Sequence, residues 1–138
     1  MAGELDGGRR WLARLKREAA GAPITIEADA PLSRLRRLYG RAALLWHACR
    51  SEHFGIALVE AMASGCVPLA PEMGGPKEII AQGKSGWLYR SVSELERLTL
   101  AAVEDRGALA RRALAARQVF RERVAAQPSN GSSATRTR

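Results

Sequence analysis

The sequence from residue 50 to residue 78 reads RSEHFGIALVEAMASGCVPLAPEMGGPKE, and this stretch decides the fold. Residues 55–63 within it are mostly good helix formers. The apolar residues that recur at the spacing of one buried helical face are Ile56, Val59, Met62 and Ala63. Gly65 is placed to end this helix in a left-handed conformation. Apolar runs of strand length lie at residues 42–46 and 66–70. The order strand, helix, strand predicts a right-handed crossover between parallel strands, and therefore an α/β fold.

Two carboxylates bracket the start of the predicted helix. Glu52 lies in the loop beyond the carboxyl end of a parallel strand, where open α/β sheets bind their ligands. The helix directs the unpaired N–H groups of residues 54–57 at the same crevice, and they form a site suited to phosphate. Glu60 lies more than one turn into the helix, so its side chain reaches a neutral polyol beside that phosphate. A carboxylate repels phosphate but accepts hydrogen bonds from sugar hydroxyls. The residues therefore predict a phosphorylated sugar or a nucleotide as ligand.

The stretch resembles the C-terminal, donor-binding domain of family-four retaining glycosyltransferases of the two-Rossmann-domain type. That family carries two glutamates separated by seven residues, then A-M-A-x-G, then a G-G-x-x-E-I loop. The matching positions here are Glu52, Phe54, Gly55, Glu60, Ala61, Met62, Ala63, Gly65, Gly74, Gly75, Glu78 and Ile79. The forms EHFGI and GGPK are most similar to the mannosyltransferases that extend lipid-linked oligosaccharides. The similarity continues more weakly over residues 9–126.

The resemblance implies a fold, a reaction and a set of site residues. The fold is a Rossmann-like parallel sheet with flanking helices. The reaction is transfer of a hexose, with mannose as one candidate, from a nucleotide-diphosphate sugar such as GDP-mannose or a UDP-hexose, with retention at the anomeric carbon. Glu52 is the catalytic candidate, which holds hydroxyls of the donor sugar, and Glu60 binds the ribose. The residues implied for the donor sugar and phosphates are His53, Phe54, Gly55, Ile56, Gly74 and Gly75. No cofactor and no metal are expected.

Two of these assignments have structural alternatives. His53 lies at the corner before the helix, and its side chain serves equally well to shape that corner. Gly74 and Gly75 fit an ordinary strand-to-helix turn as well as a ligand loop, because adjacent glycines are common in both.

The sequence predicts one domain with two short extensions. Residues 1–8 are expected to be a flexible N-terminal extension, residues 9–126 a partial glycosyltransferase C-terminal domain, and residues 127–138 a disordered tail. By the resemblance, the acceptor domain is expected to be missing, and with it the Arg/Lys pair that the family uses against the donor pyrophosphate, unless Arg9, Arg10 or Lys77 substitutes. Three interpretations follow: a donor-binding half that works with a separate acceptor-binding chain, a non-catalytic nucleotide-sugar binding module, or an inactive fragment of a longer enzyme. The chain alone is therefore expected to have little catalytic power.

The net charge of +8 comes mostly from arginines in three clusters. The clusters fit solvated helix faces, and they also fit peripheral contact with an anionic membrane. Nucleic acid is not an expected partner, because no aromatic residues are interleaved and no recognised motif is present. No apolar run approaches the roughly 20 residues that cross a bilayer, and the N-terminus has no signal-peptide core. A cytoplasmic location is expected.

The remaining elements follow from periodicity. Helices are predicted at residues 11–20, 32–39, 76–82 and 108–126, and one more from Ser91 or Ser93 to Asp105. For that helix, the capping-box pattern favours Ser93 with Glu96. Short strands are predicted at residues 24–26 and 87–89. Tyr39, Trp46 and Cys66 are expected in the core, and neither cysteine in a disulfide.

Overall fold

A computed structural model describes residues 2–50 and 54–126 of the chain. The chain divides into two compact units, Met1–Arg34 and Leu35–Arg138. Each unit is described by itself.

The first unit contains helix α1 (Ala2–Glu18) and the irregular segment that follows it. This helix begins before the predicted range and includes residues that were expected to form an N-terminal extension. On its surface, the Arg14 guanidinium lies 5.6 Å from the centre of the Trp11 ring and 2.7 Å from the Glu18 carboxylate. The strand predicted at residues 24–26 is not formed. Three residues give little pairing energy, and Ile24 is 61% exposed, so the apolar pattern there has no buried face to satisfy.

The second unit is built on a three-stranded parallel sheet in the order β1-β2-β3. Its strands are β1 (Leu44–Trp46), β2 (Val67–Pro71) and β3 (Trp87–Tyr89). The helices are α2 (Leu32–Arg41), which begins in the first unit, α3 (Ile56–Ala63), α4 (Gly75–Ile79), α5 (Val92–Glu104) and α6 (Arg106–Ala126). The predicted α/β class and the parallel crossover through α3 are confirmed.

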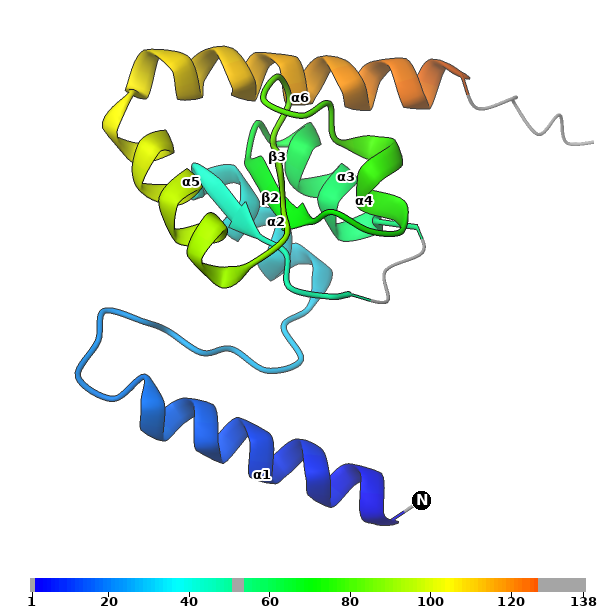
Figure 1. The fold of residues 1–138 in the computed structure, drawn as a ribbon. Coiled ribbons are helices and arrows are strands. Elements are labelled where there is room, and N and C mark those ends of the chain that lie inside the picture. The colour runs from blue at the N-terminus through cyan, green and yellow to red at the C-terminus, as the bar shows by residue number, and fades with distance from the viewer. Residues whose placement is uncertain (1, 51–53, 127–138) are drawn as a thin grey trace, which may run out of the picture. The chain divides into compact units, whose positions relative to one another are not determined.

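Helices cover both faces of the sheet, as Figure 1 shows for α5 on one side and α3 with α4 on the other. Successive residues of β2 point to opposite faces, so Ala70 packs with Leu58 of α3 while Leu69 packs with Leu98 of α5. Helix α6 packs on both faces of the sheet. Ala116 belongs to the hydrophobic cluster that contains Leu58, and Ala113 packs against the cluster that contains Leu69. All five residues of β2 are buried, as expected for the central strand of a parallel sheet.

The end of α3 follows the prediction closely. Gly65 adopts φ +81°, and its N–H donates to the Met62 carbonyl at 3.0 Å. The next N–H, that of Cys66, donates to the Ala61 carbonyl at 3.0 Å. This pair of bonds is a Schellman motif, which satisfies the last carbonyls of the helix. Cys66 then enters the core and is fully buried, as predicted, and neither cysteine is in a disulfide.

The buried face of α3 differs from the prediction. Leu58, Ala61 and Met62 are its buried residues, whereas Ile56 is 65% exposed. The predicted face combined Ile56, Val59, Met62 and Ala63. Met62 is buried and the half-buried Val59 packs against the core cluster, whereas Ile56 lines a cavity instead. A short helix with apolar residues nearly all round has no unique face in its sequence, so the sheet selects the face that packs.

Two further expectations change. Tyr39 is buried as predicted, but Trp46 is 58% exposed, and its indole N–H donates to the Thr99 hydroxyl at 3.0 Å. The amphipathic ring of Trp46 thus covers α5 and keeps its polar edge bonded. Helix α4 ends at Ile79 rather than at residue 82. Within the described ranges, no helix is both long enough and apolar enough to span a bilayer.

Candidate functional site

The candidate site begins at Gly55, the residue that starts α3. Gly55 is buried and adopts φ 63° and ψ 33°, a left-handed conformation that favours glycine. A Cβ atom on Gly55 would lie 2.4 Å from Cδ1 of Ile79, which belongs to α4. The Gly55 carbonyl accepts the first helical hydrogen bond, from the Val59 N–H at 3.0 Å. Both the backbone conformation and the contact with Ile79 therefore favour glycine at this position.

A second glycine turn starts α4 after strand β2. Gly74 adopts φ 59° and ψ −144°, a region that is essentially restricted to glycine, and Gly75 is buried. Among the described residues, no side chain caps the N-terminus of α3 or of α4. The Ile79 side chain holds α4 against Gly55, so the two glycine turns belong to one packed corner. That corner follows the carboxyl ends of two neighbouring parallel strands, where ligands of open α/β sheets bind.

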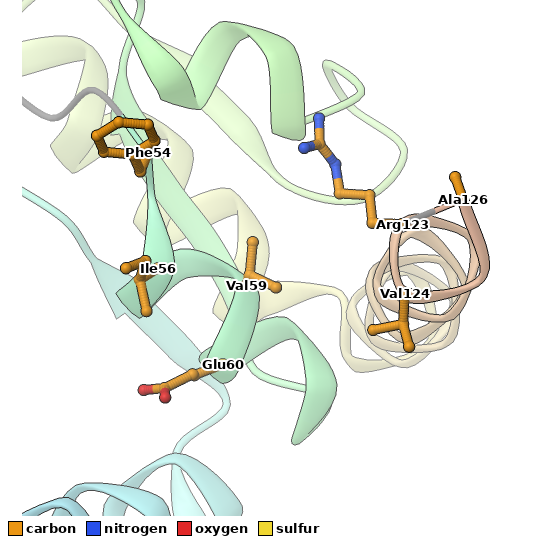
Figure 2. A pocket seen from close by; sticks show the side chains of 7 residues that line it. All are labelled: Phe54, Ile56, Val59, Glu60, Arg123, Val124 and Ala126. Atoms are coloured by element: carbon orange, nitrogen blue, oxygen red, sulfur yellow. The ribbon is translucent and has the colours of Figure 1, made fainter. Parts of the chain in front are cut away.

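A cavity of about 560 Å³ adjoins the start of α3. Its lining residues are Phe54, Ile56, Val59, Glu60, Arg123, Val124 and Ala126, which come from α3 with the residue before its cap and from the end of α6 (Figure 2). Its size is within the roughly 300–1,000 Å³ of small-molecule sites. Phe54 is 80% exposed, so much of the lining is apolar surface open to a ligand.

The two charged residues of the cavity lie on opposite sides of it. Figure 2 shows the Glu60 carboxylate on the side of α3 that faces away from α6, and Arg123 extending from α6. The pKa of Tyr39, on α2, is raised by burial first and then by the charge of Glu60, so Glu60 acts on the α2 side. The Arg123 guanidinium donates to the Glu78 carbonyl and thereby ties the end of α6 to α4.

The structure unites part of the predicted set. Phe54, Ile56 and Glu60 line the cavity, and Gly55 shapes the backbone between them. Gly74 and Gly75 are not among the residues that line the cavity, but α4 contacts its border through Ile79 at Gly55 and through the Glu78 carbonyl at Arg123. The catalytic candidate Glu52 and its neighbour His53 lie outside the described residues.

The contribution of α6 was not predicted. Val124 is 54% exposed and lines the cavity with Arg123 and Ala126. The one signal in the sequence is an arginine in the last turn of a helix, and that placement is ordinary because it suits the helix dipole. No cluster of three or more metal-ligating side chains occurs among the residues that the structure describes.

The fold is that of the Rossmann-like domains of glycosyltransferases. The structure of Anabaena Alr3699/HepE in complex with UDP-glucose superposes with a TM-score of 0.75 at 24% identity, over 88% of this chain and 34% of that one. The C-terminal domain of the glycosyl transferase group 1 family protein LpcC from Francisella tularensis gives a TM-score of 0.69 at 21% identity, over 92% of this chain and 67% of that one.

The sequence matches the family of glycosyl transferases group 1 over residues 7–119. The chain therefore belongs to that family. It is 39% identical over 76 residues to the GDP-Man:Man(3)GlcNAc(2)-PP-Dol alpha-1,2-mannosyltransferase of Xenopus laevis, which covers 52% of this chain and 16% of that enzyme. It is 38% identical over 85 residues to the sucrose synthase of Acidithiobacillus caldus, which covers 61% of this chain and 9% of the relative. The chain thus spans a small part of the length of these relatives.

Proposed function

We propose that this chain is the donor-binding half of a nucleotide-sugar-dependent retaining glycosyltransferase that transfers a hexose, with mannose the first candidate. The observation that carries the proposal is the glycine-started helix α3, whose first turn and Glu60 border a cavity of about 560 Å³. Family membership supports the reaction class, and the Xenopus laevis relative supports a GDP-mannose donor. The HepE complexes with UDP and UDP-glucose support a nucleotide-sugar ligand at this fold.

In this proposal the backbone at the start of α3 binds the donor phosphates. The first N–H groups of a helix have no partner within it and carry a partial positive charge, so they stabilise the diphosphate as it leaves. Phe54, Gly55 and Ile56 provide this surface, and the apolar side chains of Phe54 and Ile56 border it.

The two glutamates receive separate roles. Glu60 accepts hydrogen bonds from the ribose hydroxyls, because it is partly exposed at the cavity and lies one turn beyond the phosphate surface. Glu52 holds the hydroxyls of the donor sugar as the catalytic candidate, with His53 beside it. Gly74 and Gly75 face the sugar end of the donor. The carboxylates suit neutral hydroxyls better than phosphates because like charges repel.

The test of the donor role is calorimetric titration of the full chain with GDP, UDP, GDP-mannose and a UDP-hexose. Saturable binding to one nucleotide class is expected. Glu60→Ala should weaken that binding by about 1–3 kcal/mol, the cost of losing hydrogen bonds to a charged group. Glu96→Ala removes an exposed glutamate of α5 and should leave the affinity unchanged.

Two outcomes would contradict this scheme. Equal affinity of the Glu60→Ala and parent chains would remove the ribose role. Binding without turnover, even after an acceptor domain is added, would leave a nucleotide-sugar binding module in place of an enzyme.

The proposed partners are the nucleotide-sugar and an acceptor-binding domain, on the same or a separate chain. The proposed location is the cytoplasm, with peripheral contact to anionic membranes through the arginine clusters. Arg9, Arg10 and Arg17 of α1 are exposed, as such a contact requires. Co-flotation with anionic vesicles at low salt, and release as salt rises, is expected because salt screens such contacts. No flotation at low salt would leave the clusters as solvated faces.

A further inference from the structure

A second, smaller cavity lies at the carboxyl edge of the sheet. Its volume is about 170 Å³, and its lining residues are Arg50, Pro71, Glu72, Met73, Tyr89 and Arg90. Pro71 and Tyr89 are the last residues of β2 and β3, and Arg50 lies in the segment that follows β1. All three parallel strands therefore direct their carboxyl ends at this cavity, which shares none of its lining with the cavity beside α3.

The floor of this cavity is held by hydrogen bonds between the strand ends. The buried Tyr89 hydroxyl donates to the His47 carbonyl at 2.9 Å, which joins the end of β3 to the segment after β1. The Glu72 N–H donates to the Tyr89 carbonyl at 2.9 Å, which joins the segment after β2 to β3. A concave surface fixed in this way costs little conformational entropy when a ligand binds.

Two arginines border this floor, and they differ in their partners: Arg90 is in an ion pair and Arg50 is not paired with any described residue. Arg90 donates through Nε to the Glu72 carboxylate, yet its side chain remains 79% exposed. That bond orients the guanidinium and uses one of its five donors, so the terminal amino groups remain available to a ligand. Arg50 is exposed and forms no hydrogen bond or ion pair with any residue that the structure describes.

Basic charge exceeds acidic charge around the cavity. The Arg90 guanidinium first, and the charge of Lys77 less strongly, hold the pKa of Glu72 below its ordinary value. Glu94 is the other nearby carboxylate, but it already accepts a hydrogen bond from the backbone N–H of Arg90 at 2.8 Å and lies 3.8 Å from the Arg97 guanidinium. Arg50 and Lys77 are thus cations without an ion pair in the described ranges, and Glu72 is the one carboxylate among the described lining residues.

We propose that the cavity between Arg50 and Arg90 binds a phosphoryl group. Guanidinium groups recognise phosphate oxygens through paired N–H donors, and Glu72 orients one of the two groups before the ligand arrives. A volume of about 170 Å³ accepts a phosphate or phosphomonoester but is smaller than the roughly 300–1,000 Å³ of sites for larger ligands. The inference goes beyond the proposed donor role and uses none of its residues. The phosphoryl group belongs either to a second ligand or to the donor itself.

The test is titration of the ¹⁵N-labelled full chain with inorganic phosphate, and then with a hexose 1-phosphate, at constant ionic strength. Saturable shifts of the arginine Nε–H signals are expected. Arg50→Gln and Arg90→Gln should each weaken phosphate binding by about tenfold or more, as expected for a hydrogen bond to a charged group. Arg121→Gln removes an exposed arginine of α6 far along the sequence and should change nothing.

Linear, unsaturable shifts would overturn the proposal, and so would an equal loss in the Arg121→Gln chain. Arg50→Gln breaks no described hydrogen bond or ion pair, so its effect cannot be attributed to lost folding.

A competition titration with GDP and UDP distinguishes the two sources of the phosphoryl group. Displacement of phosphate by nucleotide, together with weaker nucleotide binding in both arginine variants, assigns the cavity to the donor phosphates. Independent binding of phosphate and nucleotide assigns it to a second phosphate-bearing ligand. Phosphate binding in a chain that binds no nucleotide would support this site while contradicting the donor proposal, so the two failures are distinguishable.

Discussion

Helices α3 and α5 both follow strands of the same parallel sheet, but their first turns are built differently. At α5, the Ser91 hydroxyl accepts the Glu94 N–H at 3.2 Å, and the Glu94 carboxylate accepts the Arg90 N–H at 2.8 Å. At α3, the cap residue is Gly55, which has no side chain to offer, and no described side chain caps the helix. The start of α5 is satisfied by its own chain, whereas the start of α3 adjoins a cavity.

The capped start of α5 thus has a structural role, whereas the start of α3 is a candidate binding site. A side-chain cap stabilises a helix by about 1 kcal/mol, and α3 forgoes that gain. Gly55 instead fits beneath the Ile79 side chain, so that α4 packs against the same corner. Substitutions at the start of α3 are therefore expected to reduce both stability and ligand binding. Substitutions at the start of α5 are expected to reduce stability alone.

The largest effect is expected from Gly55→Ala. The left-handed backbone disfavours a Cβ by about 1–2 kcal/mol, and the contact at 2.4 Å from Ile79 Cδ1 adds an overpacking cost of about 1–3 kcal/mol. The free energy of unfolding should fall by about 3 kcal/mol in denaturant titrations, and nucleotide binding should fall with it.

Gly40→Ala is the matched control for this substitution. Gly40 lies inside α2, and a Cβ there would meet no atom within 4 Å. Since alanine is the better helix former, this variant should be about 0.5–1 kcal/mol more stable. A Gly55→Ala chain as stable as the parent would show that Ile79 and the backbone adapt, and that the corner does not require glycine.

The opposite, buried end of α3 predicts a dependence of stability on pH. Burial raises the pKa of the Cys66 thiol from 9.0 to about 11, and Cys66 is 0% exposed. Because the folded state holds this proton more tightly, the stabilisation is complete below pH 9 and is lost as the pH rises toward about 11. The loss should reach about 2–3 kcal/mol, measured as the free energy of unfolding between those pH values.

Cys66→Ala removes the titrating group and should flatten this slope, while it lowers stability at neutral pH through lost packing. Burial also raises the pKa of Tyr39 and Tyr89, so a smaller slope should remain in the variant. An unchanged slope would assign the whole effect to the tyrosines.

The sequence was sufficient for the features that depend on local chemistry. Gly65 ends α3 in the left-handed conformation because few other residues adopt it, and the order strand, helix, strand predicted the parallel pairing of β1 with β2. The buried strand β2 follows from five consecutive residues compatible with a core. Phe54, Ile56 and Glu60 line one cavity because they lie on α3 or just before its cap, and their predicted binding roles stay predictions.

Features that depend on distant packing were not available from the sequence. The outward face of α3 is decided by which side the sheet covers, and the end of α6 joins the cavity from a helix more than 60 residues further along. Residues 24–26 have a strand-like pattern but do not form a strand, because a strand requires a partner as well as a pattern. Arg50 and Arg90 come together only because parallel strands end at one edge.

The smallest effect is expected at Ser91 and Ser93, the two candidates from the sequence for the cap of α5. Ser91→Ala should lower the free energy of unfolding by about 1 kcal/mol, because the Glu94 N–H loses its acceptor. Ser93→Ala should stay within about 0.5 kcal/mol of the parent, because its hydroxyl only contacts the Ser91 hydroxyl, at 3.1 Å. Neither variant should change nucleotide affinity in the calorimeter, since α5 lines neither end of the donor cavity. A greater loss of unfolding free energy for Ser93→Ala than for Ser91→Ala would favour the capping box of Ser93 with Glu96. A changed nucleotide affinity in either variant would contradict the purely structural role of the start of α5.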